Sequence, residues 1–437
     1  MSPRLSRPRR SSAIRNPLTL LGVALALAAN ASAQPANGLP RAPRPEDAGF
    51  SSARLARLDS LIEPMVAKGE VPGVVVFLAR NGRVVLHKAY GYRDVGTRAP
   101  LQRDDIFRIA SQTKAITSTA VMMLWEEGRF GLDDPIERYL PEFAKPTVLT
   151  KLNAADTTWT AEPARRSITI RHLLTHTSGI DYAVIGSDDF KAIYAKAGIP
   201  SGLGLPPGAT IGDRMRVLGK LPLRHQPGER FTYSLSIDVL GYLVEVLSGM
   251  PLDRFLRARI FDPLGMRDTW FYLAPERAGR LVALHDTAGG KLRPRHDPMD
   301  LFDPDWPTRA GTYFSGGGGL SGTIEDYAKF LQMILNGGEL NGVRLLGPQT
   351  IAMMLTDQLP SLPAEHGLAF GLETANNDYQ SPRTIGTFSW GGAFSTSYWA
   401  DPKEQLVALL YTNTWDVPAA GVLGSRFGNL VYAALVK

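Results

Sequence analysis

Cysteine is absent from this 437-residue chain. The absence excludes disulfide bonds, thiol nucleophiles and thiolate metal sites. The Gly-x-Ser-x-Gly elbow of α/β-hydrolases is also missing. His172 and His176 have the spacing of a zinc motif, but Leu173 stands where that motif needs glutamate. We therefore expect no metal site and no other cofactor.

The sequence has no apolar run long enough to cross a bilayer. Residues 1–16 carry five arginines and no acid, and the apolar run at 18–29 is about 12 residues, where a span needs roughly 20. Ala31-Ser32-Ala33 follows as a small-residue cleavage site. We predict a signal peptide over residues 1–33, export from a bacterial cell to the periplasm or medium, and no stable membrane anchor after cleavage.

Basic clusters are lacking as well. The five leader arginines account for most of the formal charge of +6, so the remainder is close to neutral. A nucleic-acid binder carries a basic face, and no Lys/Arg cluster follows Ala33. Nucleic acid is excluded as a partner.

Periodicity indicates one body over residues 49–437, preceded by an extended, proline-rich linker at 34–48. Asn81-Gly82 separates two β-rich runs and predicts a hairpin. Further elements are expected as helices at 51–68, 236–248 and 419–436, and as strands at 73–79, 83–87, 368–372, 384–389, 395–399 and 406–412. The predicted fold class is α/β (α+β): an antiparallel sheet from about 49–110 and 366–437, flanked by terminal helices, with an inserted all-helical subdomain at about 111–365.

The most informative stretch is Ser111-Gln112-Thr113-Lys114. Side chains three apart on a helix share one face, so the Lys114 amine can reach the Ser111 hydroxyl. The following residues are apolar nearly all round, which indicates a buried helix. A lysine is rarely buried without a partner. The pair is a candidate nucleophile and base.

Two other stretches supply the groups that acyl transfer needs. Tyr233 is expected in a turn just before the helix at 236–248, as a second proton-transfer group. Trp390-Gly391-Gly392-Ala393 interrupts two β-rich runs, and glycines there mark a close approach to the backbone. For the lysine or the tyrosine to act as a base near neutral pH, its pKa must be lowered by roughly three units. Burial lowers the pKa of a lysine. We expect one proton to be shared among Ser111, Lys114 and Tyr233.

Four blocks resemble the serine β-lactamase and penicillin-binding protein superfamily, most nearly class C β-lactamases and family VIII carboxylesterases. These blocks cover residues 107–114, 168–179, 227–233 and 317–321. The resemblance implies a β-lactamase-like fold, Ser111 as the acylated nucleophile, and Lys114 with Tyr233 as the proton-transfer pair. It also implies an oxyanion hole formed by the backbone N–H groups of Ser111 and Ala393.

Two departures from the penicillin-recognising pattern bear on the substrate. Leu235 replaces an asparagine, and Trp390-Gly391-Gly392 replaces Lys-Thr-Gly or His-Thr-Gly. We expect Leu235, Trp390, Gly391 and Gly392 to contact a neutral, apolar acyl substrate.

The predicted function is an exported serine hydrolase, most simply a carboxylesterase acting on small esters or amides. Three alternatives stay open: a β-lactamase or D-amino-acid peptidase, an acyltransferase, and an inactive binder of cell-wall fragments. The sequence does not specify the oligomeric state. His285 and His296 are expected in surface loops, and Thr323 is expected to cap a helix that follows Gly316 to Gly319.

Overall fold

The computed structural model describes residues 38–437 except 202, 204–207, 298 and 300–301. The expected signal peptide and the first residues of the expected linker lie outside this part. The α-helices are α1 (Ser52–Ala67), α2 (Thr113–Glu126), α3 (Ile170–Leu174), α4 (Asp188–Lys196), α5 (Ile211–Leu218), α6 (Ser236–Ser248), α7 (Leu252–Leu256), α8 (Asp262–Leu264), α9 (Pro275–Ala278), α10 (Ile324–Leu335), α11 (Pro348–Met354) and α12 (Pro418–Ala433). Shorter helical turns are η1 (Pro45–Ala48), η2 (Ala110–Gln112), η3 (Ile136–Arg138), η4 (Pro141–Phe143), the π-helical η5 (Arg257–Phe261), η6 (Trp306–Thr308) and η7 (Asp378–Gln380).

Seven strands form one antiparallel sheet in the order β12-β13-β14-β15-β1-β2-β3. The strands are β1 (Gly73–Arg80), β2 (Arg83–Asp94), β3 (Ala99–Pro100), β12 (Gly371–Leu372), β13 (Phe388–Gly392), β14 (Thr396–Asp401) and β15 (Leu406–Tyr411). Strand β1 pairs with β2 on one side and with β15 on the other. Both ends of the described chain therefore build one sheet, and the predicted fold class is confirmed.

Local sequence explains how the first elements form. The Ser51 side chain accepts a hydrogen bond from the backbone of Arg54 and so caps α1. Asn81 and Gly82 both have positive φ, 51° and 70°, which is the turn that a two-residue hairpin favours. Every residue of β1 is buried, as expected of a strand covered on both faces.

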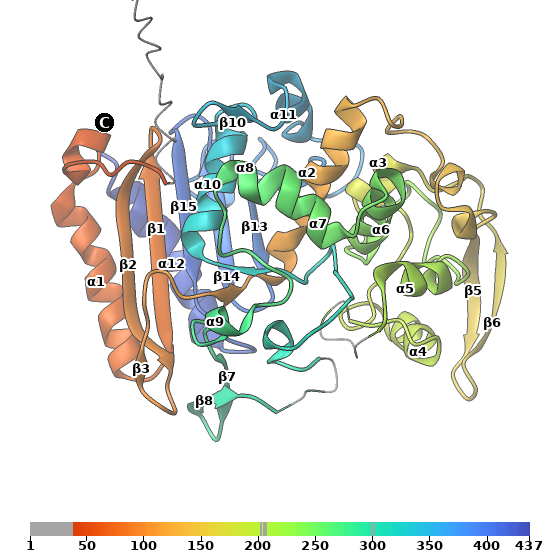
Figure 1. Ribbon diagram of the computed structural model, residues 1–437, viewed down its shortest axis with the longest axis horizontal. Coiled ribbons are helices and arrows are strands. Elements are labelled where there is room, and N and C mark those ends of the chain that lie inside the picture. The colour runs from red at the N-terminus through yellow and green to blue at the C-terminus, as the bar shows by residue number, and fades with distance from the viewer. Residues whose placement is uncertain (1–37, 202, 204–207, 298, 300–301) are drawn as a thin grey trace, which may run out of the picture. The chain divides into compact units, whose positions relative to one another are not determined.

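Helices cover both faces of this sheet. One apolar cluster joins α1 and α12 to β1, β14 and β15, and Figure 1 shows these two helices side by side. On the opposite face, α2 and α10 pack with the other side of β1 and β15 in a larger cluster that extends into α6. The catalytic candidates lie in this second layer.

The region between the two halves of the sheet is not purely helical, so the expectation of an all-helical subdomain is wrong in that detail. It contains four short antiparallel pairs: β5 (Thr147–Asn153) with β6 (Thr158–Pro163), β7 (Leu284–Ala288) with β8 (Lys291–Arg295), β10 (Glu339–Leu340) with β11 (Val343–Arg344), and β4 (Phe107–Arg108) with β9 (Ser321–Gly322). All six residues of β6 are exposed, so no buried face marks it in the sequence.

Three further expectations need correction. The strand expected at 384–389 is β13, which runs through Trp390, Gly391 and Gly392, so these residues do not interrupt the sheet. The described part of the expected linker is attached to the body, because the amide of Ala42 donates to the carbonyl of Val84 at 2.9 Å and η1 follows. His285 is fully buried in β7, and its ring hydrogen-bonds the backbone of Val95 and Asn413.

The other loop expectations are matched. His296 is exposed, and Thr323 caps α10 by accepting from the backbone of Asp326. Among the described residues, no helix is long and apolar enough to span a membrane.

Candidate active site

Ser111 lies in η2, immediately before α2, and Lys114 lies in the first turn of α2. Lys114 Nζ donates to Ser111 Oγ at 3.4 Å and to the carbonyl of Gly317 at 2.6 Å. The lysine side chain is buried. Ala110 has φ of 45°, a left-handed conformation that costs a residue with a Cβ about 1 kcal/mol. The predicted pair is therefore in contact, beside a strained backbone position.

Tyr233 lies in the turn before α6, as expected. The Lys114 Nζ is 4.6 Å from the centre of the Tyr233 ring and 5.4 Å from that of Tyr182. The two tyrosine rings stack at 5.6 Å. The buried Tyr233 Oη has no hydrogen-bond partner among the described residues. This oxygen is free to exchange a proton or to bind a substrate atom.

Asp238 is a site residue that the sequence analysis missed. It lies in the first turn of α6 and is fully buried. Its Oδ1 accepts from Ser315 Oγ at 2.7 Å, and its Oδ2 has no partner within the described chain. Burial raises the pKa of Asp238, although the Ser315 hydroxyl and the Lys114 ammonium act against this rise. An acid inside an otherwise apolar helix was the available signal, but it resembles an ordinary first-turn acid.

The surroundings of Lys114 act on its pKa in opposite directions. Burial does act to lower the pKa, but the oxygens of Tyr182 and Tyr233 and the carboxylate of Asp238 outweigh it, so the pKa lies above its ordinary value. Burial raises the pKa of Tyr182 to about 12, and the Lys114 ammonium acts against this rise. Lys114 is therefore an ammonium at neutral pH.

Strand β13 brings the predicted oxyanion region to Ser111. A Cβ at Gly392 would lie 2.4 Å from the backbone oxygen of Ile109, so only glycine allows this approach of β13 to η2. Ala393 follows β13 directly, in an exposed turn. The structure thus brings the chain at Ala393 and the chain at Ser111 together, as an oxyanion hole requires. That role remains a prediction.

Of the four residues expected to contact substrate, three lie in β13 beside Tyr233 and one lies in the core. The Trp390 ring centre is 5.6 Å from that of Tyr233, and Gly391 and Gly392 continue β13 next to it. Leu235 is fully buried in the core, so its side chain is not available to a substrate. Direct contact by Leu235 is therefore an expectation that the structure corrects.

Two buried histidines complete the surroundings of Tyr233. The His176 ring is 4.8 Å from the Tyr233 ring, and the His366 ring is 5.5 Å from Trp390. Burial lowers the pKa of His366 to about 4, so it is neutral at physiological pH. His172 accepts from the backbone of Thr169 at the start of α3. Within the described residues, no group of three His, Asp or Glu side chains is placed to hold a metal ion.

This arrangement defines a class of protein. A serine in contact with a buried ammonium, next to a tyrosine and to the edge of an antiparallel sheet, is the site of a serine hydrolase with the β-lactamase fold. The chain belongs to the Beta-lactamase family, whose model matches residues 58–431. It is a hydrolase of that fold.

Relatives within the family include mycobacterial and esterase proteins. The chain is 37% identical to Protein Rv1367c of Mycobacterium tuberculosis (strain ATCC 25618 / H37Rv) over 357 residues, which are 78% of this chain and 85% of that protein. It is 33% identical to Esterase EstB of Burkholderia gladioli over 397 residues, 86% of this chain and 95% of that protein. The solved structure of EstCE1, a hydrolase with promiscuous acyltransferase activity, matches with a TM-score of 0.76 and 29% identity over 87% of this chain and 100% of that one.

Proposed function

We propose that this protein is an exported carboxylesterase that forms an acyl-enzyme on Ser111. The observation that carries the proposal is the 3.4 Å contact between Lys114 Nζ and Ser111 Oγ, with Tyr233 beside the same ammonium. Similarity to Esterase EstB supports an ester as the substrate. Export rests on the leader sequence alone.

The mechanism follows from the charges of the site. Ser111 Oγ attacks the ester carbonyl, and its proton passes to Tyr233 Oη, because Lys114 is already protonated and cannot accept it. The ammonium of Lys114 favours negative charge on either neighbouring oxygen, so one proton is shared between these two oxygens. The backbone N–H groups of Ser111 and Ala393 receive the oxyanion. The alcohol leaves with a proton, and water then releases the acid from Ser111.

The first prediction tests this assignment. Ser111→Ala should abolish hydrolysis of p-nitrophenyl acetate and butanoate, because no acyl-enzyme can form. Lys114→Ala and Tyr233→Phe should each reduce the hydrolysis rate nearly as much as Ser111→Ala. The double variant should be only slightly slower than either, because the effects of residues that act as one unit are not additive. Steady-state rates and the mass of a trapped acyl-enzyme measure this. A Ser111→Ala protein that folds and keeps substantial esterase activity would falsify the proposal.

The second prediction separates an esterase from a β-lactamase. Trp390 stands where a cation would bind the carboxylate of a penicillin, and Leu235 stands where an amide would bind its side chain. Each of these two lost hydrogen bonds is worth about 1.5–3 kcal/mol. We expect kcat/KM for p-nitrophenyl butanoate to exceed that for benzylpenicillin by about a hundredfold or more. Trp390→Lys should narrow the difference. Equal efficiencies on the wild-type protein would instead indicate a β-lactamase.

Acyl transfer is a second candidate, because the EstCE1 structure is described as a hydrolase with promiscuous acyltransferase activity. An alcohol that enters in place of water would take the acyl group from Ser111. Adding butanol during hydrolysis of p-nitrophenyl acetate tests this: butyl acetate supports transfer, and acetate as the sole product argues against it.

A further inference from the structure

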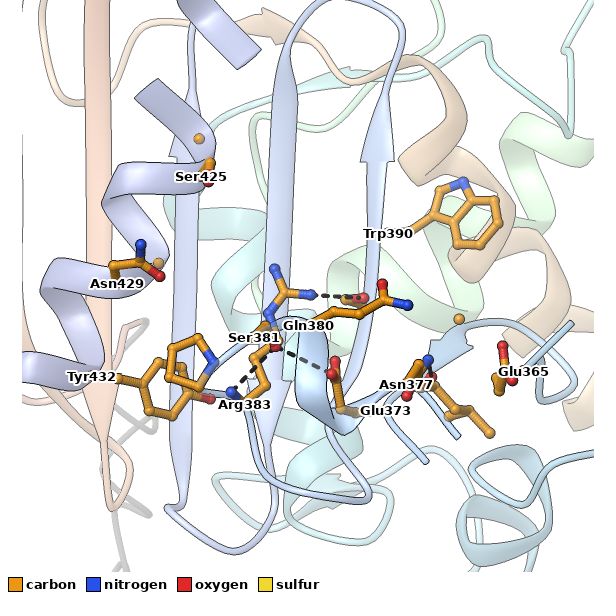
Figure 2. Close-up of a pocket in the computed structure, with 16 residues that line it drawn as sticks. Glu365, Glu373, Asn377, Gln380, Ser381, Arg383, Trp390, Ser425, Asn429 and Tyr432 are labelled. Carbon is orange, nitrogen blue, oxygen red and sulfur yellow. Dashed lines mark hydrogen bonds between the residues drawn. The ribbon is translucent and has the colours of Figure 1, made fainter. Parts of the chain in front are cut away.

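A pocket of about 430 Å³ lies at the edge of the sheet and does not include Ser111. Its walls are β12, the loop that follows β12, the outer side of β13 and one face of α12. Figure 2 shows Arg383 in the middle of the pocket, with Trp390 at one end and Tyr432 at the other. The volume is in the range of small-molecule sites.

Arg383 is the cation of this pocket. Among the described residues, the one side-chain hydrogen bond of its guanidinium goes to Ser389 Oγ at 3.5 Å, and Glu373 acts on it only through longer-range attraction. The guanidinium stacks over the Trp399 ring at 4.9 Å. Burial lowers the pKa of Arg383, which means that its charge is poorly solvated. A planar fork held in this way suits a carboxylate, which it can bind through two parallel hydrogen bonds.

Two acids face the same space. Glu373 accepts from Ser381 Oγ at 3.1 Å and lies near Arg383, and Glu365 lies toward the Trp390 end. Burial raises the pKa of Glu373, although the Ser381 hydroxyl and the Arg383 guanidinium act against this rise. The walls therefore carry one cation and two acids. A ligand with charge of one sign meets repulsion here, whereas a ligand with both signs satisfies both kinds of group.

The remaining walls provide room and an apolar end. Gly424 and Gly428 line the pocket from α12, and a Cβ built at Gly424 meets no atom within 4 Å. Trp390 lines the opposite end. Because the Trp390 ring also contacts Tyr233, the indole forms a shared wall between the pocket and the candidate active site.

We propose that this pocket binds a zwitterionic amino acid, with the carboxylate on Arg383, the ammonium on Glu373 or Glu365, and an apolar side chain toward Trp390. The ligand is either a free amino acid or the alcohol part of an ester whose acyl group reaches Ser111.

Calorimetric titration of the full protein with each enantiomer of leucine tests binding. Isocaproate lacks the ammonium and isoamylamine lacks the carboxylate, so both should bind at least about tenfold more weakly than leucine. Arg383→Gln should weaken leucine by a similar factor, and Arg426→Gln, at an exposed position of α12 outside the pocket, should not. The proposal is overturned by absence of leucine binding, by unchanged affinity in Arg383→Gln, or by isocaproate binding as tightly as leucine.

A second pair of variants keeps the test decisive if Arg383→Gln does not fold. Gly424→Leu places a side chain in the empty volume and should abolish leucine binding. Gly421→Leu on the same helix also meets no atom within 4 Å but does not line the pocket, and should bind normally. Equal binding by these two variants overturns the assignment of the pocket.

The two sources of the ligand are distinguished by kinetics, in an arm that rests on the proposed esterase function. If the amino acid is part of the substrate, Arg383→Gln lowers kcat/KM for O-butanoylserine at least about tenfold while that for p-nitrophenyl butanoate is unchanged. If the amino acid is a free ligand, Arg383→Gln changes kcat/KM for the two esters by the same factor or changes neither. Leucine still binds to the wild-type protein in that case. If the protein is not an esterase, neither ester is hydrolysed, and the calorimetric test of leucine binding still applies.

Discussion

At the scale of single residues, the site depends on charge buried in the core. The Ser111–Lys114 contact was predictable, because three-residue spacing on a helix fixes which side chains meet. Asp238 was not, because it is distant in sequence from Lys114 and only the packing of α6 against α2 brings the two together. The direction of the lysine pKa could not be predicted for the same reason: burial is visible in a sequence pattern, but the packed Tyr182, Tyr233 and Asp238 that act against it are not.

Asp238→Asn should shift the pH dependence of catalysis. Loss of the carboxylate removes one group that raises the pKa of Lys114, so the ammonium should deprotonate at lower pH. We expect the alkaline fall of kcat/KM for p-nitrophenyl butanoate to move to lower pH. Rates measured from neutral to alkaline pH detect this shift.

Asp326→Asn is the matched control. Asp326 is another buried acid in the first turn of a helix, and it pairs with Lys329 at 3.1 Å. Its loss should leave the alkaline fall in place. If both variants give the wild-type profile, Asp238 does not hold Lys114 in its charged form.

At the scale of elements, most helices and strands follow from periodicity, whereas β13 shows where this fails. Gly391 and Gly392 have low strand propensity, yet they pair with Ser397 and Thr396 of β14. The hydrogen bonds of a neighbouring strand override the local preference. The glycines were correctly interpreted as a close backbone approach, but the strand was predicted to end too early.

Gly392→Ala should separate β13 from η2. The new Cβ would lie 2.4 Å from both the Ile109 oxygen and Thr396 Oγ1, so one element must move. Because small displacements of reacting groups are costly, we expect kcat/KM to fall about a hundredfold. The same kinetic assay measures this.

Gly421→Ala controls for the substitution itself. It adds the same methyl group in α12, where no atom lies within 4 Å, and should leave kcat/KM unchanged. Its helix should gain about 0.5–1 kcal/mol of stability. Normal activity in Gly392→Ala would show that β13 and η2 tolerate separation.

At the scale of the whole molecule, burial of neutral histidines links stability to pH. Burial lowers the pKa of six of the seven histidines, to about 4 for His87, His172, His285 and His366. The ordinary value is 6.5, so between these values the unfolded chain binds more protons than the folded one. Stability present above pH 6.5 is therefore lost as the pH falls toward 4.

We expect the free energy of unfolding to decrease by about 3 kcal/mol for each such histidine across this interval. Four of them together approach the whole stability of a typical domain, about 5–15 kcal/mol, so the protein should unfold before it reaches their folded pKa values. Urea titrations at a series of pH values measure how steeply the free energy of unfolding changes with pH. His285→Gln should flatten it, whereas His296→Gln, at an exposed position, should not. Identical slopes for the two variants would argue against this origin of the pH dependence.

The order in which the strands are synthesised has a consequence for the nascent chain. Strand β1 is apolar except for Arg80 at its end, and its partner β15 is made more than three hundred residues later. Until residues 406–411 leave the ribosome, β1 presents an unsatisfied apolar edge, which is the feature that recruits chaperones or other strands. A message truncated before that point should therefore yield aggregates and degradation products rather than a smaller folded protein.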